Sequence, residues 1–172
     1  MELIKLANKT DTLNIGVADS REDMSQRDQV DALIVLPEGK IQEANVLQQV
    51  VQTVTDLVNP SSVVGFDLHE LRNAIAGRGV CHIGIGTGAG KNKVYDATDM
   101  AVKGELLKVN LWDAEQIIVQ VSGDIGFLEA SNAAGYLQEM TGYEVEVSFS
   151  AVYDASQEEE CMVAIIATGF AE

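Results

Sequence analysis

Two acidic side chains, Asp67 and Glu70, stand three residues apart at the start of a predicted helix. At this spacing they share one face of the first helical turn, where the positive end of the helix dipole favours acids. Helix capping is therefore the first explanation for the pair. Two carboxylates on one face can also polarise a water molecule for attack, and this catalytic alternative stays open.

A glycine-rich run at residues 84–91 (GIGTGAGK) is the second candidate site. A phosphate-binding P-loop needs four residues between its first glycine and the Gly-Lys pair, and then Ser or Thr. Here the spacing is one residue off and Asn92 follows the lysine, so the run is not a P-loop. Its backbone amides could still cradle phosphate. We favour the other explanation, that the glycines allow close backbone packing where a strand leads into a helix.

The remaining residues with metal-binding or nucleophilic side chains form no recognisable motif. His69 and His82 are too far apart for a local ligand pair, and neither belongs to a zinc-binding spacing. Cys81 and Cys161 each lie in an apolar, strand-like run, which predicts reduced, buried thiols. We therefore expect no metal and no cofactor.

The charge of the chain limits its partners. Its 172 residues include 11 basic and 27 acidic side chains, for a net charge of −16. Nucleic acid and anionic membrane are excluded as main partners, because the sequence has no cluster of Lys and Arg to bind phosphate. No signal peptide and no apolar run of membrane-spanning length is present, so we expect a cytoplasmic protein.

The first 60 residues have the pattern of a parallel α/β sheet. Short apolar runs indicate buried strands, and apolar residues at helical spacing indicate a long helix that ends before Pro60. A strand, short helix, strand, long helix order is typical of such a sheet. The predicted strands are residues 13–17 and 32–36, the short helix is residues 19–29 with Ser20 as its cap, and the long helix is residues 43–58.

Residues 61–172 predict a second unit, a mixed four-stranded sheet with two helices on one face. Residues 144–153 alternate between apolar and polar, which indicates a strand with one wet face, paired antiparallel with the strand that follows it. Gly142 is placed to cap the helix before it. The predicted helices are residues 67–76, 94–107 and 127–140, and the predicted strands are residues 80–86, 116–122, 144–153 and 161–168.

Several segments, in the right order, resemble the bacterial cell-division protein FtsZ, a GTPase of the tubulin/FtsZ superfamily. Residues 30–37 (VDALIVLP) resemble that family's VDTLIVIP strand, and residues 45–58 its long central helix. Residues 66–71 (FDLHEL) resemble the loop and helix that FtsZ inserts into the neighbouring subunit's nucleotide site. Residues 82–88 (HIGIGTG) are similar to the family's MGIGxATG strand, and residues 164–170 (AIIATGF) to its final VTVIATGF strand.

The resemblance implies the carboxyl-terminal domain of FtsZ, a two-layer α/β sandwich, in a diverged form. The GTP-binding half, with its GGGTGTG phosphate loop, is not in this sequence. The acidic residue that reads guanine in the family falls at Ala44, which cannot hydrogen-bond a base. The family's Asn-x-Asp-x-x-Asp falls on residues 65–70 (GFDLHE), which keep both carboxylates, Asp67 and Glu70, and have Gly65 in place of the amide.

These departures predict a non-GTPase, FtsZ-like association or regulatory module that binds itself or an FtsZ-type filament. The alternative is a half-GTPase in which Asp67 and Glu70 act as catalytic residues in trans on a partner's GTP. A small-molecule binder that uses the cleft between sheet and helix is a third possibility, and a piece cut from a longer GTPase a fourth. An adjacent reading frame that encodes the nucleotide domain would favour the half-GTPase.

The first partner that we expect is a second copy of the same chain. The strands at residues 13–17 and 32–36 would leave an edge of unpaired backbone groups. The helix at residues 43–58 would expose an apolar stripe. A homodimer that buries the strand edge or the helix face would remove both.

Overall fold

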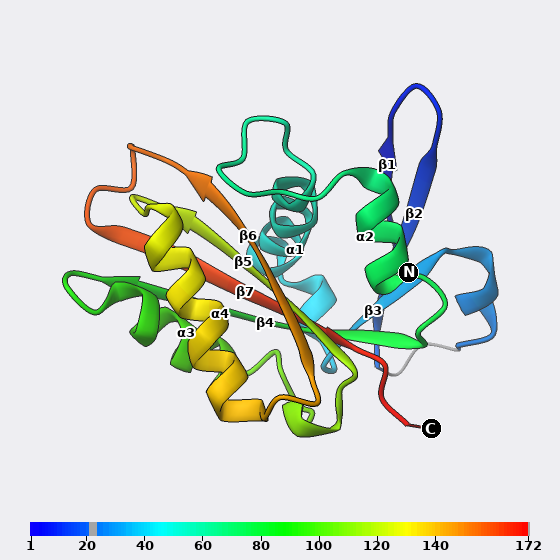
Figure 1. Cartoon of the computed structure of the whole chain (residues 1–172). Helices are drawn as coiled ribbons and strands as arrows, with labels where there is room; N and C mark the ends of the chain where they lie inside the picture. Colours follow the sequence, from blue (N-terminus) through cyan, green and yellow to red (C-terminus); the bar gives the residue numbers. More distant parts are fainter. Residues whose placement is uncertain (21–23, 172) are drawn as a thin grey trace.

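The computed structural model describes residues 1–20 and 24–171, which form a seven-stranded mixed sheet with the strand order β1-β2-β3-β4-β7-β5-β6 (Figure 1). The strands are β1 (Glu2–Ala7), β2 (Thr12–Asp19), β3 (Ala32–Leu36), β4 (Val80–Ala89), β5 (Gln116–Gly123), β6 (Glu146–Tyr153) and β7 (Glu160–Thr168). The helices are α1 (Ala44–Leu57), α2 (Leu68–Ile75), α3 (Lys93–Lys103) and α4 (Phe127–Thr141), and the short 3-10 turns are η1 (Met24–Gln29), η2 (Lys40–Gln42) and η3 (Leu111–Asp113).

The expected fold class is confirmed. Strands β2, β3 and β4 run parallel, and β4, β7, β5 and β6 form the mixed four-stranded part of the sheet. Helices α3 and α4 pack on one face of that part, around a core that includes Ala97, Ala133 and Val163. Because β3 pairs with β4, the two predicted units share one sheet. We keep the division near residue 60 as a proposal that limited proteolysis can test.

Strand β1 was not predicted, and it changes the amino-terminal edge of the sheet. It pairs antiparallel with β2 over its whole length, from Glu2 opposite Val17 to Ala7 opposite Thr12. The prediction that the strand at residues 13–17 has a free edge is therefore wrong. Glu2 and Lys5 interrupt the apolar run in this segment, so it lacks the continuous apolar pattern from which the other short strands were predicted.

The predicted pairing of the last two strands is also wrong. Strand β7 lies between β4 and β5 and is antiparallel to both, whereas β6 runs parallel to β5 at the outer edge. The acidic turn at residues 154–159 therefore carries the chain past β5 instead of closing a hairpin. The face of β6 that was expected to be wet is largely covered, because Ser150 is fully buried there.

Helix α1 covers the opposite face of the sheet from α3 and α4. Its apolar residues Val50, Val54 and Leu57 are buried in a core that also contains Ile118 and Ile166. The residues of α1 that face solvent are mostly uncharged and polar, and Val51 is the large apolar side chain that remains exposed. The predicted apolar stripe on this helix is therefore wrong, because the sheet occupies that face.

Local signals set most of the predicted helix ends. Helix α1 stops just before Asn59-Pro60, and Gly142, at a φ of 86°, ends α4 with its N–H bonded to the carbonyl of Gln138. The short helix predicted at residues 19–29 differs from the structure at both ends. Strand β2 extends through Asp19, and Met24–Gln29 forms a 3-10 turn instead of an α-helix. The part of that prediction at residues 21–23 lies outside the described residues. In the described part of the chain, no helix is both long and apolar enough to cross a membrane.

Candidate functional site

The loop at residues 59–66, which joins α1 to α2, is fixed at both ends and in the middle. The Phe66 N–H donates to the Leu57 carbonyl at 2.9 Å. Val64 forms an isolated antiparallel bridge with Ala151 of β6, and the Ala151 N–H donates to the Val64 carbonyl at 2.8 Å. The Ser150 hydroxyl donates to the same carbonyl at 3.0 Å. These bonds hold the backbone in one conformation and leave the side chain of Val63 48% exposed.

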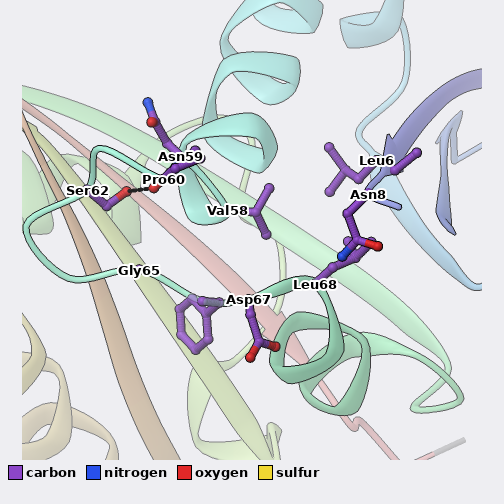
Figure 2. A pocket seen from close by; sticks show the side chains of 11 residues that line it. Leu6, Asn8, Val58, Asn59, Pro60, Ser62, Gly65, Asp67 and Leu68 are labelled. Carbon is purple, nitrogen blue, oxygen red and sulfur yellow. Dashed lines mark hydrogen bonds between the residues drawn. The ribbon is translucent and has the colours of Figure 1, made fainter. Parts of the chain in front are cut away.

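A cavity of about 580 Å³ opens beside this loop, at the point where three elements meet. Leu6 and Asn8 come from the β1–β2 hairpin, and Asp67 and Leu68 come from the start of α2 (Figure 2). The end of α1 and the loop complete the wall, with the Ser62 hydroxyl bonded to the Asn59 carbonyl at 2.7 Å. The wall therefore combines apolar side chains with amide, hydroxyl and carboxylate groups.

Asp67 and Glu70 form a capping box at the start of α2. An oxygen of Asp67 accepts the Glu70 N–H at 2.7 Å, and an oxygen of Glu70 accepts the Asp67 N–H at 3.0 Å. The predicted capping role is thus confirmed. Both side chains are exposed, and Asp67 borders the cavity. Nothing in this geometry tests a catalytic role, which stays a prediction.

Arg72 holds α2 against the β1–β2 hairpin. Its guanidinium binds Asp11 at 2.9 Å and Asp31 at 3.1 Å, and it also donates to the Thr12 carbonyl. The hydrogen bond from Arg72 lowers the pKa of Asp11. Because Asp67 caps the helix that contains Arg72, these contacts also set where the capping carboxylate lies relative to Leu6 and Asn8.

Asp56, in the last turn of α1, is an acid inside the protein. It is 5% exposed, and the Gln52 amide donates to it at 2.7 Å. Burial raises the pKa of Asp56, the hydrogen bond from Gln52 lowers it, and the nearby charge of Asp154 raises it further. This carboxyl group therefore destabilises the fold when it is ionised.

The glycine-rich run has the packing role that we favoured. Gly84, Gly86 and Gly88 lie on one face of β4, directly under α3. A Cβ atom on them would lie 2.3, 2.1 and 2.0 Å from the backbone oxygens of Ala101, Ala97 and Lys93. Since residues 82–89 also pair with β7, this segment is a strand and not a phosphate-binding loop.

The two histidines lie on different elements, and the two cysteines are buried, as predicted. His69 is exposed on the surface of α2. His82 is a half-buried residue of β4, and its imidazole ring packs edge-to-face with the ring of Phe170. Cys81 and Cys161 are buried and free, and burial raises the pKa of both thiols to about 11. Among the described residues, no group of three or more His, Cys, Asp or Glu is placed to hold a metal ion.

Sequence reasoning missed Leu6, Asn8 and Arg72 as parts of this site. A signal for the turn of the hairpin was present, because the Asn8 side chain accepts the N–H groups of Thr10 and Asp11, as an asparagine does at a turn. No local signal marks Arg72, because its partners are 41 and 61 residues away.

Solved structures of the tubulin/FtsZ type share this fold. An FtsZ dimer from M. jannaschii, described as empty, superposes with a TM-score of 0.72 at 20% identity, over 83% of this chain and 46% of that one. The GDP-bound monomer of CetZ1 from Haloferax volcanii gives 0.65 at 17% identity, over 92% and 56%. The GTPγS-bound protofilament of CetZ2 from the same organism gives 0.60 at 14% identity, over 92% and 55%. The chain thus spans about half the length of the structures it matches.

The family assignment rests on the sequence. Residues 79–171, from the start of β4 to the end of β7 and beyond, match the model of the FtsZ family, C-terminal domain. This stretch contains the glycine-bearing strand β4, helices α3 and α4, and strand β7 at the centre of the mixed sheet. The match covers more than half of the 172 residues, and the chain therefore belongs to the FtsZ family.

Proposed function

We propose that this chain is an association module of the FtsZ type that docks on an FtsZ-type subunit through the loop at residues 59–66 and the start of α2. Two matched structures carry the words dimer and protofilament in their descriptions, so assembly occurs among the relatives. The observation that carries the proposal is the loop itself. Its backbone is fixed by hydrogen bonds to α1 and β6, while Val63 and Asp67 remain exposed. A surface fixed before binding loses little conformational entropy on docking.

Docking is favoured over catalysis by the state of the two carboxylates. Each of Asp67 and Glu70 already accepts a backbone N–H in the capping box. Gly65 supplies no side-chain amide beside them. Residues 82–89 form a paired strand and no phosphate loop. A module that offers the docking surface and binds no nucleotide would join one end of a filament and stop its growth there.

The half-GTPase remains the second candidate, because one observation favours it. Asp67 and Glu70 are both exposed, and Asp67 lies at the border of the cavity, where a partner's nucleotide could approach it. Carboxylates near a γ-phosphate are tolerated when magnesium or water offsets their charge. In this reading they would orient the attacking water on a neighbour's GTP.

The test is to add the protein, in substoichiometric amount, to polymerising FtsZ from the same organism and to follow light scattering and phosphate release. Shortened filaments that persist with the double variant Asp67→Asn and Glu70→Gln would support the cap, since amide side chains can still accept at the capping box. Phosphate release that rises with the wild type and disappears in the double variant would support the half-GTPase.

A pair of charge variants locates the docking surface. Val63→Asp places a charge on the exposed loop and should abolish the effect on filaments. Tyr143→Asp places the same charge on a side chain that is 88% exposed at the other end of β6, and should leave the effect intact. If the wild type changes neither scattering nor phosphate release, both readings are refuted.

A further inference from the structure

The outer edge of β1 is an unpaired end of the sheet. Strand β1 is first in the strand order and pairs only with β2 among the described strands. In this strand the side chain of Leu3 is 58% exposed, and that of Lys5 is exposed as well. An exposed strand edge is a template for another strand, because its N–H and C=O groups have no partner in the sheet.

The hydrogen bonds of β2 show which backbone groups of β1 point outward. The Asp31 N–H donates to the Asn14 carbonyl and the Ser20 N–H to the Leu36 carbonyl, so the even-numbered residues of β2 bond to β3. The odd-numbered residues of β2 therefore face β1, where they stand opposite Glu2, Ile4 and Leu6. It follows that the N–H and C=O groups of Leu3 and Lys5 point away from the sheet.

Charge distinguishes this edge from the one at the other end of the sheet. Two copies that carry −16 each repel one another, so a seam between them must be locally neutral. Strand β1 carries one acid and one base, Glu2 and Lys5. The edge strand β6 begins at Glu146, two residues after Glu144, and both side chains are exposed. The outer edge of β6 is also partly covered, because Val64 of the loop at residues 59–66 forms a bridge with Ala151 there. Among the described residues, the outer edge of β1 has no such bridge.

We propose that a second copy of this chain adds its β1 antiparallel to β1 and so joins two seven-stranded sheets across a two-fold axis. The inference goes beyond the proposed function, since it uses the outer edge of β1 and not the loop at residues 59–66. Residues on the same face must stand opposite each other, so the axis passes through one of the central residues, Ile4 or Lys5. We place Ile4 on it, because Lys5 on the axis would put two like charges directly opposite each other. Leu3 and Lys5 of the two copies then exchange their outward N–H···O bonds.

This register also adds a group to the cavity. With Ile4 on the axis, Glu2 of the second copy stands opposite Leu6, which lines the cavity next to α2. Glu2 and Leu6 share the face of β1 that carries the buried Ile4. The second copy would therefore contribute a carboxylate to the border of the candidate site.

The first test distinguishes the contribution of the outward N–H of Lys5 to dimerisation from that of its side chain. Lys5→Pro removes an N–H that β2 does not use, and proline is tolerated on an edge strand in that position. Lys5→Ala, the matched control, removes the side chain and keeps the N–H. Light scattering at high micromolar concentration should give twice the 18.5 kDa monomer mass for the wild type and for Lys5→Ala. Lys5→Pro loses two hydrogen bonds per dimer and should dimerise roughly 30-fold more weakly.

The second test keeps the inference open to refutation if the proline variant fails to fold. In the proposed register the two Ile4 residues form a non-hydrogen-bonded pair with Cα atoms about 4.5 Å apart, within reach of a disulfide. Ile4→Cys should give a cross-linked dimer under mild oxidation, and the wild type should not, because Cys81 and Cys161 are buried.

A wild type that stays monomeric, or an Ile4→Cys variant that does not cross-link, would overturn the β1 seam. Neither result bears on docking to FtsZ, which the Val63→Asp experiment tests separately. Failure of the seam and failure of the proposed function are therefore distinguishable.

Discussion

Replacing Gly86 by alanine tests the packing of α3 on β4. The new Cβ would lie 2.1 Å from the Ala97 carbonyl oxygen and 2.5 Å from the Ala101 nitrogen. Both are backbone atoms of α3, so neither can move aside as a flexible side chain could. Ordinary contact begins at 3.4 Å, so the helix must retreat by about 1.3 Å, the difference between 3.4 and 2.1.

Such a retreat loosens a helix whose inner residues are buried. Val94, Thr98 and Ala101 are at most 5% exposed and would lose contacts with the sheet. Overpacking a well-packed core costs about 1–3 kcal/mol, and a clash with backbone belongs at the upper end. We therefore expect Gly86→Ala to lower the free energy of unfolding by about 3 kcal/mol. For a protein of this size, that corresponds to a fall of about 6–12 °C in Tm.

The measurement is urea and thermal unfolding of both the variant and a matched control. Gly135→Ala makes the same chemical change on the exposed side of α4, where a Cβ meets nothing within 4 Å. Alanine is the better helix former, so this control should stabilise by about 0.5–1 kcal/mol. The two substitutions should thus have opposite signs. A Gly86→Ala variant within about 1 kcal/mol of the wild type would refute the packing explanation of the glycines.

Three further outcomes follow from the structure. Asp67→Ala should lower stability by about 1 kcal/mol through loss of the cap, whereas Asp67→Asn should retain most of it, as thermal unfolding of the two variants will show. Burial raises the folded-state pKa of Asp56 above its ordinary 3.8, so its charge reduces stability as pH rises through and above that range. Asp56→Asn should therefore be more stable than the wild type at neutral pH, and urea midpoints should converge in acid; a less stable variant at neutral pH would contradict this. Calorimetric titration with GTP and magnesium should show no saturable heat, because residues 84–89 are a paired strand; micromolar affinity would restore them as a phosphate site.

Predictions from the sequence succeeded where a few neighbouring residues decide the conformation. The end of α1 follows from Pro60, which constrains the residue before it, and the end of α4 from a glycine at positive φ. The role of Asp67 at the start of α2 follows from its spacing to Glu70. In each case the interacting groups lie within one helical turn, so the sequence pattern contains the whole interaction.

Predictions failed where distant residues decide. The pairing of β6 with β7 was inferred from their adjacency in sequence, but β5 competes for both and lies between them. The exposed stripe on α1 was inferred from its apolar residues alone, whereas Ile118 and Ile166 of the sheet cover them. The order of strands in a sheet depends on contacts far apart in the chain, which no short pattern records.

The sequence by itself determined the family and the main helices of this protein, because these depend on motifs and on spacing within short segments. It also supplied the two carboxylates and the loop that precedes them. Only the tertiary structure decided that β1 forms the edge of the sheet beside β2, that Arg72 ties α2 to the hairpin, and that Leu6 and Asp67 border one cavity. The reason is physical: these arrangements are formed by ion pairs, strand pairing and burial between residues that only the folded chain brings together.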